Sequence, residues 1–274
     1  MKQFEDKIAI VTGGAAGIGR ALCEELAGYG AMVIIADINA ENAKKTAGEI
    51  NKAGGRATGK QLDVTNIEAI QNLIDEIVSE YGRIDYMINN AGIGLMGEVR
   101  DMELDQYRRL VDVNIMGIFY GCRAAYSVMI KQGFGHIVNL GSIAGLITFP
   151  MQSVYSATKF AVQSFTMGLR AEAAELGIKV SVICPMNIKS DMLEGSMTVV
   201  GMKDKNWFAN LPVKWMDANE AARKMLKGVA KNKGVIIVPG KAKIFWWLFR
   251  LFPGLFDFIG KEGTKKFRKD RVEA

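Results

Sequence analysis

The sequence has a single histidine, His136, and this scarcity argues against two common kinds of catalytic site. No cysteine or acidic residue accompanies it at metal-ligand spacing, so we expect no metal site. The run from Gly141 to Gly145 superficially matches the G-x-S-x-G elbow of serine hydrolases. In that fold the catalytic histidine follows the serine, whereas His136 precedes Ser142, so a Ser–His–acid triad is rejected.

Cysteine is also scarce, which argues against a disulfide-stabilised secreted protein. The three cysteines, Cys23, Cys122 and Cys184, are widely spaced, odd in number and surrounded by apolar residues. We therefore expect buried free thiols in a reducing compartment. A strand-like run already begins at Lys7–Val11, so we expect no signal peptide and a cytoplasmic location.

Most of the chain has almost no net charge, although the formal net charge of the whole sequence is +6. Residues 241–274 carry nine Lys/Arg against four Asp/Glu, and the preceding 240 residues are nearly balanced. Nucleic-acid binding requires a basic face, so we expect no nucleic-acid partner for the body of the protein.

Apolar, β-branched runs alternate with longer segments of helical spacing. Several of the runs are apolar throughout, which indicates burial on both faces, as in a parallel sheet covered by helices. The pattern predicts an α/β fold, a single doubly wound Rossmann-type domain with a mostly parallel sheet of about seven strands. The expected strands are Ile8–Val11, Met32–Ala36, Ala57–Leu62, Tyr86–Asn89, His136–Leu140, Lys179–Cys184 and Val235–Val238. The expected helices are Ala21–Tyr29, Ala40–Ala53, Ile67–Tyr81, Leu104–Lys131 and Ser153–Leu176.

We expect this catalytic domain to occupy residues 1–240. It would include an insertion, residues 186–216, over the substrate side. Residues 241–274 depart from the pattern and form an apolar and basic C-terminal helical tail.

A glycine-rich turn, Thr12–Gly19, follows the first predicted strand and opens the first helix. Glycine permits positive φ and close approach of backbone to a ligand. Amides at a helix N-terminus favour a pyrophosphate. A tight strand–helix turn would need the same residues, but the position after the first strand favours dinucleotide binding.

Asp37 ends the second predicted strand, eighteen residues after Gly19. A carboxylate there can accept hydrogen bonds from the adenosine ribose and would repel a 2′-phosphate. The next residue, Ile38, is not basic, so the sequence favours NAD over NADP. A helix-capping role for Asp37 is compatible with this interpretation.

With these motifs in order, the sequence resembles the short-chain dehydrogenase/reductase family over roughly Asp6–Pro239. Further matches are Leu62–Val64, Asn89–Gly92 and the segment from Pro185. The resemblance implies a catalytic tetrad of Asn114, Ser142, Tyr155 and Lys159. It departs from the family at Met186, where a glycine usually follows the proline. The implied cofactor-binding residues are Gly13, Ala16, Gly17, Ile18, Gly19, Asp37, Ile38, Asp63, Val64, Asn90, Ala91, Gly92, Tyr155, Lys159, Pro185, Met186, Ile188 and Ser190.

Tyr155 and Lys159 share one face of a helix because they are four residues apart. A nearby ammonium and the positive nicotinamide ring favour tyrosinate, so we expect Lys159 and the cofactor to lower the Tyr155 pKa. Such a phenol is a general base for alcohol oxidation and a general acid for ketone reduction. The Ser142 hydroxyl can polarise the substrate oxygen. By resemblance, Lys159 also binds the nicotinamide ribose, and Asn114 holds a water.

The loops on the substrate side are rich in methionine and aromatic residues, which adapt to bulky apolar ligands. We expect a steroid-, lipid- or terpenoid-like substrate, although these residues could simply pack the insertion. The candidate substrate residues are Leu95, Met96, Ile143, Phe149, Met186 and Met192.

The tail from Ile244 to Ile259 is strongly apolar but shorter than a bilayer-spanning helix. Pro253 should interrupt the helix near Phe252. On one helix, Phe245, Phe249, Phe252, Phe256 and Ile259 would share a face. The tail could lie peripherally on an anionic membrane, cover the substrate mouth or pack at a subunit interface.

Together these features predict an NAD(H)-dependent oxidoreductase that interconverts a secondary alcohol and a ketone. The alternatives are a 3-oxoacyl thioester reductase and a dinucleotide-binding module without turnover. Asp37 disfavours the former because such reductases usually prefer NADPH. The resemblance also implies a homodimer or homotetramer built on the two longest helices.

Overall fold

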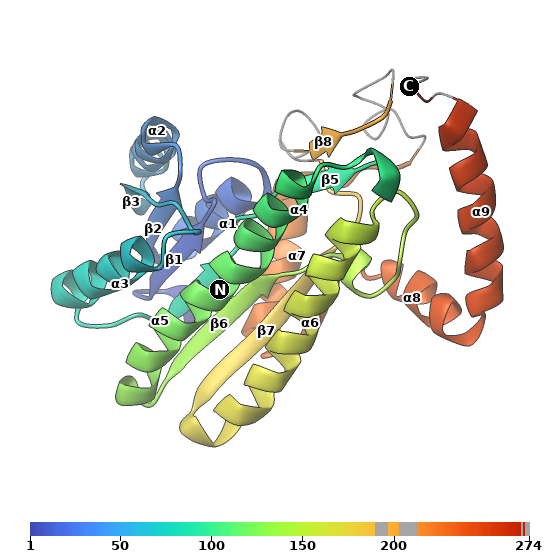
Figure 1. Cartoon of the computed structure of the whole chain (residues 1–274). Helices are drawn as coiled ribbons and strands as arrows, with labels where there is room; N and C mark the ends of the chain where they lie inside the picture. The colour runs from blue at the N-terminus through green and yellow to red at the C-terminus, as the bar shows by residue number, and fades with distance from the viewer. Residues whose placement is uncertain (190–196, 203–212, 270, 272–274) are drawn as a thin grey trace.

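A seven-stranded parallel sheet forms the centre of the molecule in the computed structural model (Figure 1). The structure describes residues 1–189, 197–202, 213–269 and 271. The strands lie in the order β3-β2-β1-β4-β6-β7-β9, so the chain reverses its winding direction between β1 and β4. In such sheets a ligand crevice opens at that reversal, beyond the carboxyl ends of the strands. The strands are β1 Ile8–Thr12, β2 Met32–Asp37, β3 Arg56–Gln61, β4 Tyr86–Asn89, β6 Gly135–Leu140, β7 Ile178–Pro185 and β9 Val235–Val238.

Helices cover both faces of the sheet, as expected for a doubly wound fold. One face carries α1 Gly17–Gly28, α2 Ala40–Lys52 and α7 Ala218–Ala230. The other carries α3 Ile67–Tyr81, α5 Gly117–Gln132 and α6 Ser153–Ala173, with α4 Leu104–Val111 beside α6. Short 3-10 turns occupy Lys2–Phe4, Val99–Asp101, Ile143–Gly145 and Ala174–Leu176.

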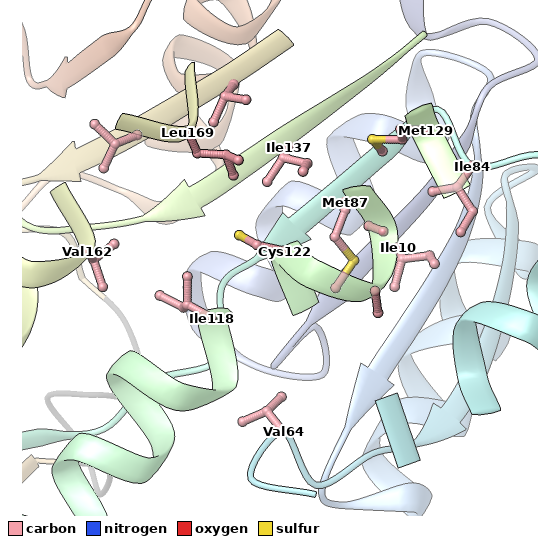
Figure 2. Close-up of a cluster of buried hydrophobic side chains, with 14 of the residues drawn as sticks. Ile10, Val64, Ile84, Met87, Ile118, Cys122, Met129, Ile137, Val162 and Leu169 are labelled. Carbon is pink, nitrogen blue, oxygen red and sulfur yellow. The ribbon is translucent and has the colours of Figure 1, made fainter. Parts of the chain in front are cut away.

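The core forms two apolar layers, one on each side of the sheet. Every residue of β1 is buried, which accounts for its apolar sequence without alternation. Figure 2 shows part of the layer under α3, α5 and α6, where Ile10 and Met87 from the sheet lie near Cys122 and Met129 from α5. All three cysteines are buried and free, as predicted.

The helix starts follow from local side-chain chemistry. Asn39, Asn66 and Asp217 each accept a hydrogen bond from a backbone amide in the first turn of α2, α3 and α7. Gly82 and Gly133 end α3 and α5 in the left-handed conformation that glycine adopts without strain.

The predicted long helix, Leu104–Lys131, is interrupted by a π-helical turn at Asp112–Met116. By length and composition alone, Leu104–Gln132 could cross a membrane. Its α5 portion instead packs against α3, β4 and β6, which is the position of a core helix. A small parallel pair, β5 Gly94–Met96 with β8 Met197–Val199, was not predicted.

The tail forms two helices, α8 Ala242–Leu251 and α9 Pro253–Lys269, which meet at the predicted break (Figure 1). The prediction of one aromatic face is wrong, because the break at Phe252 turns the two helices relative to each other. Phe249 and Phe256 contact each other and the core, whereas Phe245, Phe252 and Ile259 are exposed.

The C-terminal end of α9 packs against the domain through Phe267 and Arg268. Phe267 is fully buried against Met96 and Met202. The Arg268 guanidinium forms an ion pair with Glu98 at 2.7 Å. These contacts join the tail to the segment that carries β5.

Candidate active site

The glycine-rich turn between β1 and α1 is a cradle that tolerates no side chains at its key positions. Gly13 and Gly17 have φ of +61° and +52°. A Cβ on Gly19 would lie 2.0 Å from the Gly13 carbonyl oxygen, so glycine is required there. The Asn90 amide donates to the carbonyl oxygens of Thr12 and Gly13, each at 2.9 Å. The turn is thus fixed to the end of β4.

A cavity of about 310 Å³ opens along this turn and across the ends of β1, β2 and β4. Twelve residues predicted to bind the cofactor line it: Gly13, Ala16, Gly17, Ile18, Gly19, Asp37, Ile38, Asp63, Val64, Asn90, Ala91 and Gly92. Sequence reasoning missed Leu62, Ile93, Arg109, Val113 and Leu140, which also line it. Arg109 is the charged residue among these five. Nothing in the sequence around it indicated that Arg109 would line the cofactor cavity.

Asp37 stands at the end of β2 with its carboxylate held by two backbone amides. One oxygen accepts from Ala15 N at 3.1 Å and the other from Asn39 N at 3.0 Å. A carboxylate offers about four acceptor positions, so two remain for a ligand. Asp63 is likewise oriented by Thr65, whose amide and hydroxyl both donate to one of its oxygens.

The cradle, the cavity and the oriented carboxylates fit a dinucleotide. The absence of a Cβ at Gly19 lets the first turn of α1 pack directly against the Gly13 carbonyl and the Asn90 side chain. The helix N-terminus offers amides to phosphates, and the carboxylate at the end of β2 offers acceptors to sugar hydroxyls.

Ser142 and Tyr155 come together beyond the end of β6. Ser142 precedes the 3-10 turn at Ile143–Gly145, and its Oγ accepts from Ala144 N at 3.1 Å. Tyr155 lies in the first turn of α6 and is only 7% exposed. Burial raises the pKa of Tyr155, and a hydrogen-bonding interaction with Ser142 lowers it by a smaller amount.

Lys159 lies one helical turn after Tyr155, and 3% of its surface is exposed. Its Nζ donates to the Leu140 carbonyl at 3.0 Å and lies 5.7 Å from the centroid of the Tyr155 ring. Burial lowers the pKa of Lys159 to about 8.

The pKa of Tyr155 is therefore raised in the protein alone, and its lowering by Lys159 together with a bound nicotinamide ring stays a prediction. The desolvation of the phenol outweighs every other influence on Tyr155. Desolvation also lowers the pKa of Lys159, because burial favours the neutral amine over the ammonium ion. Nearby Cys184 is buried too, with its thiol pKa raised to about 12.

Asn114 occupies the π-helical turn that interrupts the predicted long helix. Its Oδ1 accepts from Ile93 N and its Nδ2 donates to Ile93 O, both at 2.9 Å. The same Nδ2 reaches Thr158 Oγ1 at 3.3 Å. A π turn frequently marks a functional site because it redirects a side chain out of the helical register. Here it aims the amide at the loop after β4.

A second cavity, also about 310 Å³, contains Ser142, Tyr155 and Lys159. It shares Ile18, Asn90, Gly92 and Leu140 with the first cavity, so the two adjoin. The cradle and the tyrosine thus face one continuous region at the carboxyl ends of the strands. The predicted residues Pro185, Met186 and Ile188 line the second cavity.

Three of the predicted substrate residues, Ile143, Phe149 and Met186, line the second cavity. Leu95 and Met96 do not, because the unpredicted β5 buries them, so this assignment is wrong for this cavity. Ser190 and Met192 lie outside the described residues. Met197 and Trp215, two apolar residues of the predicted insertion, also line the second cavity, as do Ala144, Gln152, Asn187 and Val213, which the sequence did not single out.

His136 lies in the core, away from this site. It is 4% exposed and shares a hydrogen bond with Ser181 at 2.8 Å. Burial lowers the pKa of His136 to about 3, so the imidazole is neutral. Within the described residues, no cluster of three metal-ligating side chains is present.

Comparison with known proteins agrees with this geometry. Residues 7–198 match the family model described as short chain dehydrogenase. A Mycobacterium tuberculosis protein named as an oxidoreductase, SadH, is 34% identical over 272 residues, which cover 97% of this chain and 98% of the relative. A Burkholderia phymatum short chain dehydrogenase/reductase, solved in complex with NAD, is 25% identical with a TM-score of 0.84, covering 93% and 96%. A Streptomyces avermitilis short-chain dehydrogenase is 27% identical with a TM-score of 0.79, covering 95% and 96%.

Proposed function

Because the chain belongs to the short-chain dehydrogenase family, we propose that it interconverts a hydrophobic secondary alcohol and its ketone with NAD(H) as cofactor. The observation that carries this proposal is the junction of the two cavities. A glycine cradle with Asp37 opens into the same region as Ser142 and Tyr155. NAD(H), when bound, supplies or accepts the hydride.

Different residues would bind different parts of the cofactor. The amides of the cradle at the start of α1 would hold the pyrophosphate. Asp37 would accept hydrogen bonds from the adenosine ribose, and Asp63 would contact the adenine. Lys159 would bind the second ribose, because one N–H of its ammonium donates to the Leu140 carbonyl and two N–H groups remain for a ligand.

Proton transfer belongs to Tyr155. At neutral pH its raised pKa keeps the phenol protonated, so Tyr155 is ready to donate to the oxygen of a ketone as that oxygen gains charge. In the reverse direction the phenolate takes the hydroxyl proton of the alcohol. Ser142 donates to the same substrate oxygen and stabilises its developing charge.

The second cavity supports an apolar substrate. Its wall includes Phe149, Met186, Met197, Val213 and Trp215, and methionine and aromatic side chains suit large apolar ligands. Gln152 adds an amide to this wall. Gln152 is 8% exposed. A substrate with a second polar group near the reacting carbon would find a hydrogen-bonding partner in this amide.

The test is a spectrophotometric screen of hydroxysteroids, aliphatic secondary alcohols and aromatic alcohols, with NAD and NADP in parallel. We expect NAD-dependent turnover that favours large apolar alcohols and is lost in Tyr155→Phe. A preference for short, charged alcohols would contradict the substrate class. NADH binding without turnover of any alcohol would favour a binding module, and activity on an acyl-carrier thioester would favour the 3-oxoacyl reductase.

We also propose that the protein is a homo-oligomer assembled on α5 and α6. Phe119 and Phe165 contact each other across these helices in a tilted arrangement with centroids 4.2 Å apart, and Phe160 on α6 is exposed. Light scattering of the full-length protein tests this assembly. A monomer that retains full activity would contradict it.

A further inference from the structure

The tail helices expose an unusual amount of apolar surface. Between residues 244 and 259, nine large apolar side chains are exposed by more than a third of their surface. These are Ile244, Phe245, Trp247, Leu248, Leu251, Phe252, Leu255, Phe258 and Ile259. Contiguous apolar patches of this size are rare on soluble proteins and mark interaction surfaces.

The exposed face of α8 follows regular helical spacing. Ile244, Trp247, Leu248 and Leu251 lie at i, i+3, i+4 and i+7, and exposure reaches 64% at Leu251. The opposite face already has its partners, because Trp246 and Phe249 pack against the core. The outer apolar face therefore contributes nothing to the folding of a single chain.

The tail does not use this face to cover the site. The residues of α9 that contact the domain include Phe256, which packs against the core, and Phe267, which is buried with Met96. The Thr264 hydroxyl contacts Met151 Sδ at 3.8 Å. Leu255, Phe258 and Ile259 are exposed by half or more. Figure 1 shows α8 and α9 together at one side of the molecule, beyond α6.

A lysine-ringed cavity of about 290 Å³ lies beside the start of α8. Its wall is β9 and α7, and its rim carries Lys224, Lys227, Lys231, Lys233 and Lys243. The first three lie at i, i+3 and i+7 on α7, so they share one face. Lys224 forms an ion pair with Glu220, whereas the other four lysines of the rim form none with the described residues. Lys243 directly precedes the exposed Ile244, so the cavity adjoins the apolar face.

We propose that this combined surface, the lysine cavity with the apolar outer face of α8 and α9, docks on an anionic lipid bilayer. The apolar side chains enter the boundary between headgroups and acyl chains, and the lysines bind lipid phosphates. Charge complementarity selects this partner. A symmetric contact between two copies through the same face would set lysines against lysines, which is repulsive.

The experiment is flotation of the full-length protein with vesicles of phosphatidylcholine alone or mixed with phosphatidylglycerol. We expect binding to the anionic vesicles at low salt, weak binding to the neutral ones and release at high salt. Each lysine near such a surface contributes about fivefold to partitioning, so Lys227→Gln/Lys231→Gln/Lys243→Gln should weaken binding on the order of 100-fold. The matched control Lys44→Gln/Lys45→Gln/Lys52→Gln, on exposed positions of α2, should bind nearly as the unaltered protein does.

A second variant tests the apolar part. Trp247→Ser/Leu248→Ser/Leu251→Ser should reduce binding at least tenfold. It should leave thermal unfolding unchanged, because these side chains are exposed. Leu104→Ser, 69% exposed on α4, is its control.

Two results would overturn the proposal. One is failure to float with anionic vesicles at low salt. The other is a lower molar mass for the serine variant in light scattering, which would make the face a subunit interface. Both readouts are independent of catalysis, so they remain informative if no alcohol is turned over.

Discussion

Replacing Asp37 by asparagine tests the proposed choice between NAD and NADP. Asparagine keeps the shape of the side chain and one acceptor oxygen, but it removes the charge. In the structure both carboxylate oxygens are oriented by the amides of Ala15 and Asn39, so the remaining lone pairs point in fixed directions. The substitution should therefore weaken NAD binding and remove the repulsion of a 2′-phosphate.

The magnitude follows from two contributions. Hydrogen bonds to a charged group are worth about 1.5–3 kcal/mol, so kcat/KM with NAD should fall by about 10- to 150-fold. Like charges about 4 Å apart near a protein surface repel by about 1–4 kcal/mol, and this penalty on NADP disappears. Together they amount to at least about 2.5 kcal/mol, so the preference for NAD over NADP should decrease at least about 50-fold.

The assay is steady-state turnover of one alcohol with each cofactor. Asp63→Asn is the matched control, because Asp63 lines the same cavity but is assigned to the adenine, which both cofactors share. It should weaken both cofactors equally and leave their ratio unchanged. If Asp37→Asn leaves the ratio unchanged, or if Asp63→Asn changes it as much, the assignment of Asp37 to the ribose is wrong.

Three further predictions concern the cradle and the buried pair. Gly19→Ala places a Cβ 2.0 Å from the Gly13 carbonyl oxygen and should raise the Kd of NADH, measured by calorimetry, at least tenfold. Gly28→Ala is the control, because its Cβ meets no atom within 4 Å, and it should leave the Kd of NADH unchanged. Because the pKa of Tyr155 is raised, alcohol oxidation should accelerate toward alkaline pH, and a rate independent of pH would contradict this. The folded pKa of Lys159 is about 8, below its ordinary 10.5, so the unfolded chain binds more protons between these values and stability rises with pH there. Lys159→Met should remove this rise, about 3 kcal/mol, from urea unfolding measured at pH 7 and pH 10, and an identical pH dependence in the variant would refute the shift.

The parallel sheet was readable from the sequence because its strands are buried on both faces and lack polar alternation. Likewise, the glycine turn and Asp37 are local patterns tied to strand ends, and twelve of the eighteen residues predicted to bind the cofactor line one cavity. The pairing of β5 with β8 was not readable, since it joins Leu95 to Thr198 across about a hundred residues. That pairing is what buries Leu95 and Met96 away from the second cavity.

The π turn at Asn114 also escaped prediction, because the sequence continues with ordinary helical spacing through it. The lysine cavity depends on bringing α7 and the start of α8 together, and helical spacing relates only the three lysines on α7. A side chain's neighbours across the fold, unlike its neighbours along the helix, are set by tertiary packing.

The same distinction explains why helical spacing did not predict the raised pKa of Tyr155 in the protein without cofactor. Spacing on α6 correctly placed Lys159 beside the phenol, but spacing carries no information on desolvation, which opposes charge on both groups. The unliganded pair therefore favours a neutral phenol, which suits proton donation to a ketone. Alcohol oxidation requires the phenolate, and a positive charge in the adjoining cavity would stabilise it. A cofactor that is cationic in its oxidised form and neutral in its reduced form would thus set the Tyr155 pKa to match each direction of the reaction.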